Sequence, residues 1–271
     1  MYINTNVGAI NAHRNLVGNN LSMNKTMEKL SSGYRINRAA DDAAGLAISE
    51  KMRFQINGLN QAQRNAQDGI SLIQTAEGAL TEVHSMLQRM NTLANQAVNG
   101  TYKDEDREKI DLEVQELIKE IDNISSKTTF NGIKLLDSTD QVKFQIGSEE
   151  NDTISVTLGN MSSTELGVDA ASLDVKTSTA AAAAITAIKE AISTVSTQRA
   201  TFGSVQNRLE HTINNLGVNA ENLSAAQSRI RDADMASEMT SFTKNQILVQ
   251  AGTSMLAQAN SVPQNVLKLL G

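Results

Sequence analysis

Two short segments of the chain place two arginines just ahead of two aspartates, at residues 35–42 and 229–234. A pair of carboxylates can act as general acid and general base. The same carboxylates can cap helices, since they accept backbone N–H bonds in a first turn and favour the positive end of the helix dipole. Both segments precede a long helical pattern, so capping is the favoured interpretation over catalysis. The eight charged residues are Arg35, Arg38, Asp41, Asp42, Arg229, Arg231, Asp232 and Asp234.

Other residues capable of chemistry are isolated in the sequence. The three histidines, His13, His84 and His211, have neither a second histidine nor a glutamate at metal-binding spacing. Cysteine is absent, so thiolate metal sites and thiol nucleophiles are excluded. Phosphate-binding glycine loops and nucleophile elbows are absent as well. We therefore expect no enzyme activity, no metal and no cofactor.

The composition favours helices over a compact mixed fold. Hydrophobic residues make up 40% of the 271 residues, but aromatic residues only 3%, with no tryptophan and one proline. Alanine, leucine, isoleucine and methionine suit narrow seams between helices. The net charge of -6 gives no support to nucleic-acid binding. No apolar run reaches the roughly 20 residues of a membrane-spanning helix, and no secretory signal peptide is visible.

Apolar residues recur at steps of three and four along most of the chain, which predicts a mainly α fold. A first helix ends at Gly33, and further helices are expected at about 43–99, 104–127 and 176–223, followed by one from about 235 to the C-terminus. Pro263 predicts a kink or a new helical start after Ser261. Alternation at 141–146 and 153–158 predicts a β-hairpin within a region of about 130–170. The expected architecture is a long antiparallel coiled-coil-like rod with paired terminal helices.

Both ends of the chain are poor in charge. Only Arg14 is charged before Lys25, and only Lys244 and Lys268 are charged after Met239. Such faces suit burial among copies of the same chain, where each charge would be repeated in every neighbour; alternatively the ends are poorly ordered alone and fold on assembly. The residues expected to pack there are Ile3, Val7, Ile10, Val17, Leu21, Leu248, Met255, Leu256, Val266 and Leu269.

The charged segments at 35–42 and 229–234 lie where the charge-poor ends meet the charged middle of the chain. We expect them to connect an inner and an outer layer. Our hypothesis is that an arginine of one segment pairs with an aspartate of the other, for example Arg35 with Asp232, and that this pairing sets the geometry of the joint.

The same region resembles a known family. Residues 30–37 and 41–48, followed by 65–80, closely resemble the N-terminal signature of bacterial flagellins, and residues 250–260 and 262–267 resemble the flagellin C-terminus. The likeness covers nearly all of residues 1–136 and 200–271. It implies an inner domain formed by 1–42 with 228–271 and an outer rod domain at 43–227. With about fifty residues between the third and fourth helices, no large central insert is expected.

The resemblance also implies a function, partners and a location. A flagellin is a structural subunit that polymerises into the bacterial flagellar filament for motility. The implied partners are further copies of the chain, the flagellar export chaperone at about 232–271, the secretion apparatus, and hook-associated and cap proteins. The implied location is the extracellular flagellum, reached by secretion. Nucleic-acid binding and membrane insertion are not expected.

A Toll-like innate immune receptor is a further partner that the resemblance implies. The contact residues would be Gln88, Arg89, Leu93 and Glu113. On the other interpretation, Arg89 and Glu113 are simply solvent-facing or intersubunit charges. Two alternatives to a filament subunit stay open: a hook–filament junction protein, which shares the terminal helices, and a helical scaffold protein, which should carry charged helix ends.

Overall fold

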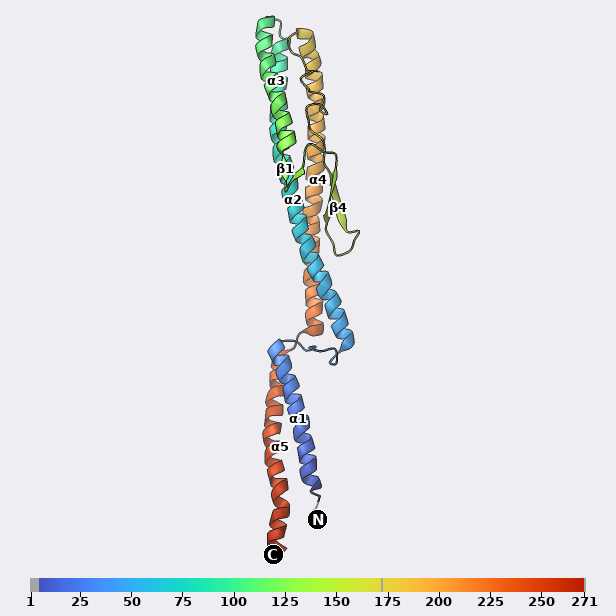
Figure 1. Ribbon diagram of the computed structural model, residues 1–271, viewed down its shortest axis with the longest axis vertical. Coiled ribbons are helices and arrows are strands. Elements are labelled where there is room, and N and C mark those ends of the chain that lie inside the picture. The colour runs from blue at the N-terminus through green and yellow to red at the C-terminus, as the bar shows by residue number, and fades with distance from the viewer. Residues whose placement is uncertain (1–4, 172, 271) are drawn as a thin grey trace. The chain divides into compact units, whose positions relative to one another are not determined.

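The computed structural model describes residues 5–171 and 173–270, and the side chains of these except 262–270. It is built from long helices and two short antiparallel strand pairs, which confirms the mainly α fold (Figure 1). The helices are α1 (Val7–Ser32), α2 (Ala43–Val98), α3 (Asp104–Lys127), α4 (Ser178–Arg231) and α5 (Met235–Leu270), and the strands are β1 (Thr129–Phe130), β2 (Ile133–Lys134), β3 (Gln141–Gln145) and β4 (Thr153–Thr157).

The chain divides into two compact units. The terminal unit comprises Met1–Ile56 and Glu221–Gly271, and the central unit comprises Asn57–Ala220. The terminal unit thus takes in the first turns of α2 and the last turns of α4 along with α1 and α5. The inner and outer domains expected at 1–42 with 228–271 and at 43–227 follow the helix ends instead, and remain a prediction.

In the terminal unit, α1 and α5 run antiparallel along one seam (Figure 1). Asn6 Nδ2 donates to the Ala259 carbonyl over 2.7 Å at one end, and Lys29 pairs with Glu238 at 3.1 Å at the other. The half-buried residues on each helix alternate in steps of three and four, which is coiled-coil spacing. Those at this spacing are Ala9, Ala12, Leu16, Asn19, Met23, Thr26 and Leu30 on α1, and Glu238, Phe242, Asn245, Val249, Gly252, Leu256 and Ala259 on α5.

In the central unit, the core lies between α2, α3 and α4. The apolar residues at helical spacing face inward, and Leu80, Val114 and Ile188 are fully covered. Phe202 is the largest fully buried side chain, so small and branched aliphatic residues fill most of the seam. Burial of this kind supplies the main free energy of folding. The low aromatic content is therefore compatible with a well-packed core.

The strand pairs lie in the segment between α3 and α4. β3 pairs with β4 from Gln141↔Thr157 to Gln145↔Thr153, which confirms the expected hairpin. Its alternate side chains, among them Phe144, Ile154 and Val156, join the core of the central unit. The smaller pair β1–β2 was not expected. It turns at Asn131 and Gly132, whose φ angles are 48° and 81°, as the Asn-Gly sequence of a two-residue hairpin requires.

Two helix boundaries differ from the expectation. α4 continues to Arg231 instead of ending near 223, because residues 224–231 include good helix formers and no breaker, although the apolar stripe fades there. α5 is one helix from Met235 to Leu270, so the expected new start after Ser261 is wrong. Proline disturbs a helix only locally, and the apolar pattern on both sides of Pro263 shares one period.

Candidate assembly surface and connectors

Two connectors meet in the terminal unit: the first connector, residues 33–42, follows α1, and the second connector, residues 232–234, precedes α5. The Arg35 amide donates to the Arg231 carbonyl over 2.7 Å, and the Ala233 amide donates to the Gly33 carbonyl over 2.9 Å. These bonds flank an antiparallel bridge between Tyr34 and Asp232. Gly33 ends α1 in the left-handed region, with φ 74°, which lets the chain turn into this bridge.

The arginines of the connectors bond differently from our hypothesis. Arg35 Nη2 donates to the Ile230 carbonyl over 2.6 Å, and Arg38 Nε pairs with Glu28 at 2.8 Å. Arg231 Nη1 pairs with Glu50 at 2.6 Å. Among the described residues, no ion pair joins an arginine of residues 35–42 to an aspartate of 229–234, or the reverse. Backbone bonds and the Arg35–Ile230 contact hold the connectors together instead.

Three of the four aspartates cap turns or helices, as the alternative interpretation predicts. Asp42 Oδ1 accepts the Gly45 amide over 2.8 Å at the start of α2. Asp234 Oδ1 accepts the Ala236 amide over 3.0 Å at the start of α5. Asp41 Oδ2 accepts the amides of Arg38 and Asn37. The bond from the Arg38 amide is the main cause that lowers the pKa of Asp41 below its ordinary value.

The sequence did not single out Tyr34 and Glu50 as connector residues. The centre of the Tyr34 ring lies 4.7 Å from the Arg231 guanidinium carbon, while Glu50 pairs with the same guanidinium. Tyr34 lies between Gly33 and Arg35, in a chain with few aromatic residues, and this rarity could have marked it as a connector residue. Glu50 lies inside the helical pattern of α2 and carried none.

The apolar residues expected to pack at the ends are mainly uncovered. On α1, Ile10 is 60% and Leu21 61% exposed, Val7 and Val17 are also exposed, and no residue of this helix is buried. On α5, Leu248 and Met255 are exposed, together with Met235, Met239 and Ile247. Leu256 is half-buried in the α1–α5 seam. Ile3 lies outside the described residues, as do the side chains of Val266 and Leu269.

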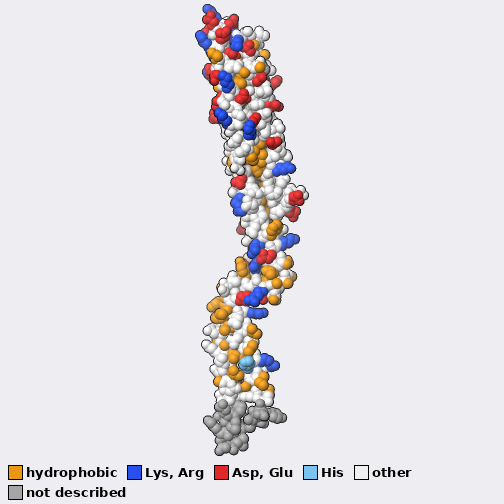
Figure 2. Space-filling view, in the orientation of Figure 1, with side chains coloured by type: hydrophobic (Ala, Val, Ile, Leu, Met, Phe, Trp, Pro, Cys, Tyr) orange, Lys and Arg blue, Asp and Glu red, His pale blue; other side chains and the backbone are white. Residues whose placement is uncertain are grey.

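These uncovered residues form two assembly stripes, defined here as Val7, Ile10, Val17 and Leu21 on α1, and Met239, Ile247, Leu248 and Met255 on α5. The four α1 residues are three, seven and four positions apart, which is the spacing of a second coiled-coil seam beside the one that contacts α5. On α5 a hollow of about 470 Å³ lies beside Ile247 and Leu248, lined also by Thr240, Thr243 and Lys244. Figure 2 shows hydrophobic side chains over α1 and α5 with few charges between them.

The four residues of the implied receptor contact do not share one surface. Gln88 and Arg89 on α2 and Glu113 on α3 are exposed, and Arg89 Nη2 pairs with Glu113 Oε1 at 2.7 Å. Leu93 is only 2% exposed, because it packs into the core between the helices. The Leu93 side chain is therefore covered in the free chain, and the receptor contact at these four residues stays a prediction.

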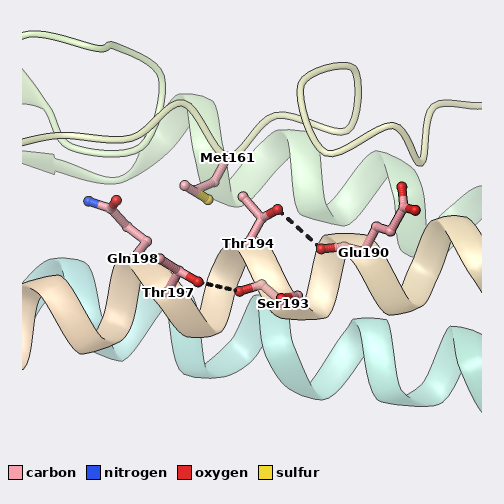
Figure 3. A pocket seen from close by; sticks show the side chains of 6 residues that line it. All are labelled: Met161, Glu190, Ser193, Thr194, Thr197 and Gln198. Carbon is pink, nitrogen blue, oxygen red and sulfur yellow. Dashed lines mark hydrogen bonds between the residues drawn. The ribbon is translucent and has the colours of Figure 1, made fainter.

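A hollow of about 430 Å³ in the central unit gives no catalytic arrangement. It lies between Met161 and one face of α4, as Figure 3 shows. The hydroxyls of Thr194 and Thr197 donate to carbonyls of their own helix, and Gln198 Nε2 donates to the Thr157 carbonyl. The hydroxyls are thus used locally, and none bonds to a histidine or a carboxylate that would activate it.

No group of three or more histidine, aspartate or glutamate side chains among the described residues is placed to hold a metal ion. No described helix is both long enough and apolar enough to cross a lipid bilayer.

Long seam-packed helices, capped connectors and uncovered apolar stripes at paired ends define a structural protein of the self-assembling helical class. Residues 3–141 match the family model of the bacterial flagellin N-terminal helical region, and residues 185–270 match that of the bacterial flagellin C-terminal helical region. The chain belongs to the bacterial flagellins. It is a structural subunit of the flagellar filament.

Curated relatives match over their whole length. The chain is 56% identical to a flagellin of Halalkalibacterium halodurans over 272 residues and 53% identical to a flagellin of Bacillus subtilis over 304, covering all of each protein. It is 50% identical, again over both full lengths, to a flagellar filament 33 kDa core protein of Treponema phagedenis.

Solved structures agree on the fold. The crystal structure of Bacillus cereus flagellin has a TM-score of 0.52 and 37% identity, and the match covers 60% of this chain and 94% of that one. A protein described as flagellar hook-associated, from Vibrio parahaemolyticus, has a TM-score of 0.60 at 14% identity, covering 71% of this chain. The second match shows the fold alone.

Proposed function

We propose that the chain polymerises through the two assembly stripes, which contact the α1 and α5 helices of neighbouring copies. The observation that carries this proposal is the exposure of large apolar side chains along helices that already share one complete seam. A second seam at coiled-coil spacing has a helix of the same type as its natural partner. Contacts that do not close on themselves then extend an open helical polymer.

The scarcity of charge on these helices supports the same proposal. Arg14 lies in the gap that the α1 stripe leaves between Ile10 and Val17, and it donates to Asn11 on its own helix over 3.0 Å. The other polar residues between Val7 and Leu21 are four asparagines and His13. Neutral side chains can be covered by a neighbouring copy without the cost of burying like charges side by side.

Point substitutions within the α1 stripe test the proposal. Ile10→Asn and Leu21→Asn should each raise the critical concentration for elongation from filament seeds by about tenfold, because burying such a side chain contributes about 1.5–3 kcal/mol. Ser22→Asn, at an exposed polar position of the same helix, is the matched control. Circular dichroism checks that helix content is unchanged. Elongation of both apolar variants at the wild-type critical concentration would contradict the proposal.

A deletion tests the role of α5 as a whole. A chain that lacks residues 236–271 retains the central unit but loses the α5 stripe and the α1–α5 seam. Electron microscopy after seeding should show long filaments from the full chain only. Equal elongation by the shortened chain would show that assembly does not require the terminal helices.

We also propose that the chain is secreted through the flagellar apparatus and acts in the extracellular filament. Export in an unfolded form would expose the apolar residues of α5. A chaperone that covers residues 232–271 would prevent these residues from aggregating before export. Hook-associated and cap proteins would contact the same terminal helices at the two ends of the filament. Chaperone binding should be lost on deletion of 236–271 and retained on substitution in the central unit, as calorimetry would measure.

Recognition by a Toll-like receptor is a separate proposal, which rests on Gln88, Arg89 and Glu113. Their side chains are exposed on neighbouring faces of α2 and α3, and the Arg89–Glu113 pair gives the surface one fixed polar feature. Arg89→Ala and Glu113→Ala should weaken receptor signalling, whereas Lys119→Ala, on an exposed α3 pair further along, should not. Signalling unchanged by all three substitutions would reject the contact.

The hook–filament junction alternative has no observation in its favour. The fold is common to flagellins and to the hook-associated protein, so the fold does not separate the two. The full-length relatives described above are named flagellins or filament core proteins. Abundance along isolated filaments, measured by quantitative mass spectrometry, would distinguish a filament subunit from a junction protein.

A further inference from the structure

Arg231 contacts three separate segments of the terminal unit. It is the last residue of α4, and its Nη1 pairs with Glu50 Oε1 at 2.6 Å, two turns into α2. Its guanidinium lies over the Tyr34 ring, with 4.7 Å from the guanidinium carbon to the ring centre. Its backbone carbonyl accepts the Arg35 amide over 2.7 Å. One residue therefore joins the end of α4, the start of α2 and the first connector.

The environment of Arg231 makes this arrangement sensitive to loss of any partner. The side chain is only 16% exposed, and its Nε is buried without a hydrogen-bond partner. The charge is therefore balanced mainly by the Glu50 carboxylate and by the face of the Tyr34 ring. A planar guanidinium can stack on an aromatic face and pair with a carboxylate at once, whereas the compact ammonium of lysine cannot reproduce both contacts.

The backbone around Arg231 supplies little stiffness of its own. The connectors share one isolated bridge, between Tyr34 and Asp232, flanked by two backbone hydrogen bonds. A strand pair this short is not stable alone in water. The Arg35 bond to the Ile230 carbonyl and the Lys29–Glu238 pair lie on either side of the bridge. The Arg231 side chain lies against both the first connector, at Tyr34, and α2, at Glu50.

We propose that Arg231, acting through Tyr34 and Glu50, is a positioning residue that gives the two connectors the same conformation in every subunit. This inference rests on the proposed assembly through α1 and α5. A helical polymer repeats one relation between neighbours, so variation in the connectors is passed on to each subunit added. The Arg231 contact with Tyr34 and Glu50 thus controls the uniformity of the filament, while the assembly stripes control whether it forms.

The test separates filament shape from filament formation. Arg231→Met and Tyr34→Leu should elongate from seeds with the critical concentration raised by less than about tenfold, since the stripes are untouched. Their twist per subunit, measured by cryo-electron microscopy, should spread over a wider range than in wild-type filaments. Tyr34→Phe keeps the ring face and should retain the wild-type twist. Arg231→Lys keeps the charge and should lie between wild type and Arg231→Met.

Arg229→Met is the matched control, because Arg229 lies two residues away on an exposed face of the same helix end. Arg229→Met should leave both the critical concentration and the distribution of twist per subunit unchanged. A wild-type twist distribution in Arg231→Met and Tyr34→Leu would overturn the positioning role. If Arg231→Met does not elongate, the filaments of Tyr34→Leu and Glu50→Gln test the positioning role instead. A wild-type distribution of twist in both variants would also overturn that role. Failure of the wild-type chain to elongate would instead overturn the assembly proposal on which this inference rests.

Discussion

Arg107 and Arg89 show how differently the same residue type contributes in the central unit. Arg107 is 8% exposed, and its Nε donates over 2.8 Å to the Ala97 carbonyl in the last turn of α2. Arg89 pairs with Glu113 in solvent. Arg107→Met leaves a buried carbonyl unpaired and should lower the free energy of unfolding by about 2–3 kcal/mol. Arg89→Met should cost less than about 1 kcal/mol.

Urea unfolding followed by circular dichroism measures both changes. Each substitution removes one positive charge from the central unit, so the comparison isolates burial and carbonyl capping from net charge. An equal decrease in the free energy of unfolding in the two variants would show that the Arg107 bonds contribute no more to stability than an exposed ion pair.

Asp41 gives the first connector a dependence on acid. The amides of Arg38 and then Asn37 donate to its carboxylate, over 3.0 and 3.3 Å, and hold the pKa of Asp41 below its ordinary value. A lowered pKa in the folded state means that the turn is stabilised above the unfolded pKa and loses this stabilisation as pH falls through the folded value. The chemical shifts of these two amides should therefore titrate with a midpoint below that of an ordinary aspartate.

The Asp41→Asn variant is the control for this titration. It keeps an acceptor oxygen in the turn but has no proton to gain, so the acid-dependent change at the two amides should disappear. A midpoint at or above that of an ordinary aspartate in the wild-type chain would contradict the assigned cause.

At the scale of elements, two glycines of α2 distinguish helix propensity from helix packing. A Cβ at Gly78 would meet nothing within 4 Å, whereas a Cβ at Gly69 would lie 3.2 Å from the Phe144 ring of β3 and 3.3 Å from Leu209 of α4. Gly78→Ala should stabilise the central unit by up to about 1 kcal/mol, because alanine is the better helix former. Gly69→Ala should lose that gain or destabilise, since the hairpin must shift. Thermal unfolding compares the two, and an equal rise in both variants would contradict the close packing at Gly69.

The helices of the chain could be predicted from the sequence because their apolar residues keep one period over many turns. The steps of three and four predicted α2 and α3 to within about a residue, and the change to a period of two predicted β3 and β4. The end of α4 was missed because residues 224–231 stay helical after the apolar stripe fades. β1–β2 was missed because two-residue strands have no period to read, although Asn131-Gly132 was a turn signal.

The connectors show where sequence reasoning falls short. Charge and position identified the right residues, and helix capping by Asp42 and Asp234 was foreseen from residue type alone. The partners of Arg35 and Arg231 were not, because a backbone carbonyl and a distant glutamate leave no local pattern. Ion pairs between segments depend on which side chains lie close together after folding. Opposite charge alone is therefore compatible with several different pairings.

At the scale of the molecule, the two units bury their side chains to very different extents. The central unit has a continuous aliphatic core between α2, α3 and α4. In the terminal unit α1 has no buried residue, and none of the described side chains of α5 is buried. On the proposed assembly through α1 and α5, neighbouring subunits would cover the apolar surface that the terminal unit leaves exposed. Assembly then stabilises the helices that perform it.

Hydrogen exchange gives this difference a measurable form. Amides open with a free energy set by the burial around them, so α1 and α5 should exchange much faster than α2 and α4 in the free subunit. In filaments, the α1 and α5 amides should slow by orders of magnitude, while the core of the central unit changes little. Mass spectrometry of peptides from free subunits and from filaments measures the exchange of each helix separately. Equal protection of α1 in free and assembled subunits would mean that neighbouring copies do not cover its apolar stripe, and the filament contacts would have to lie elsewhere.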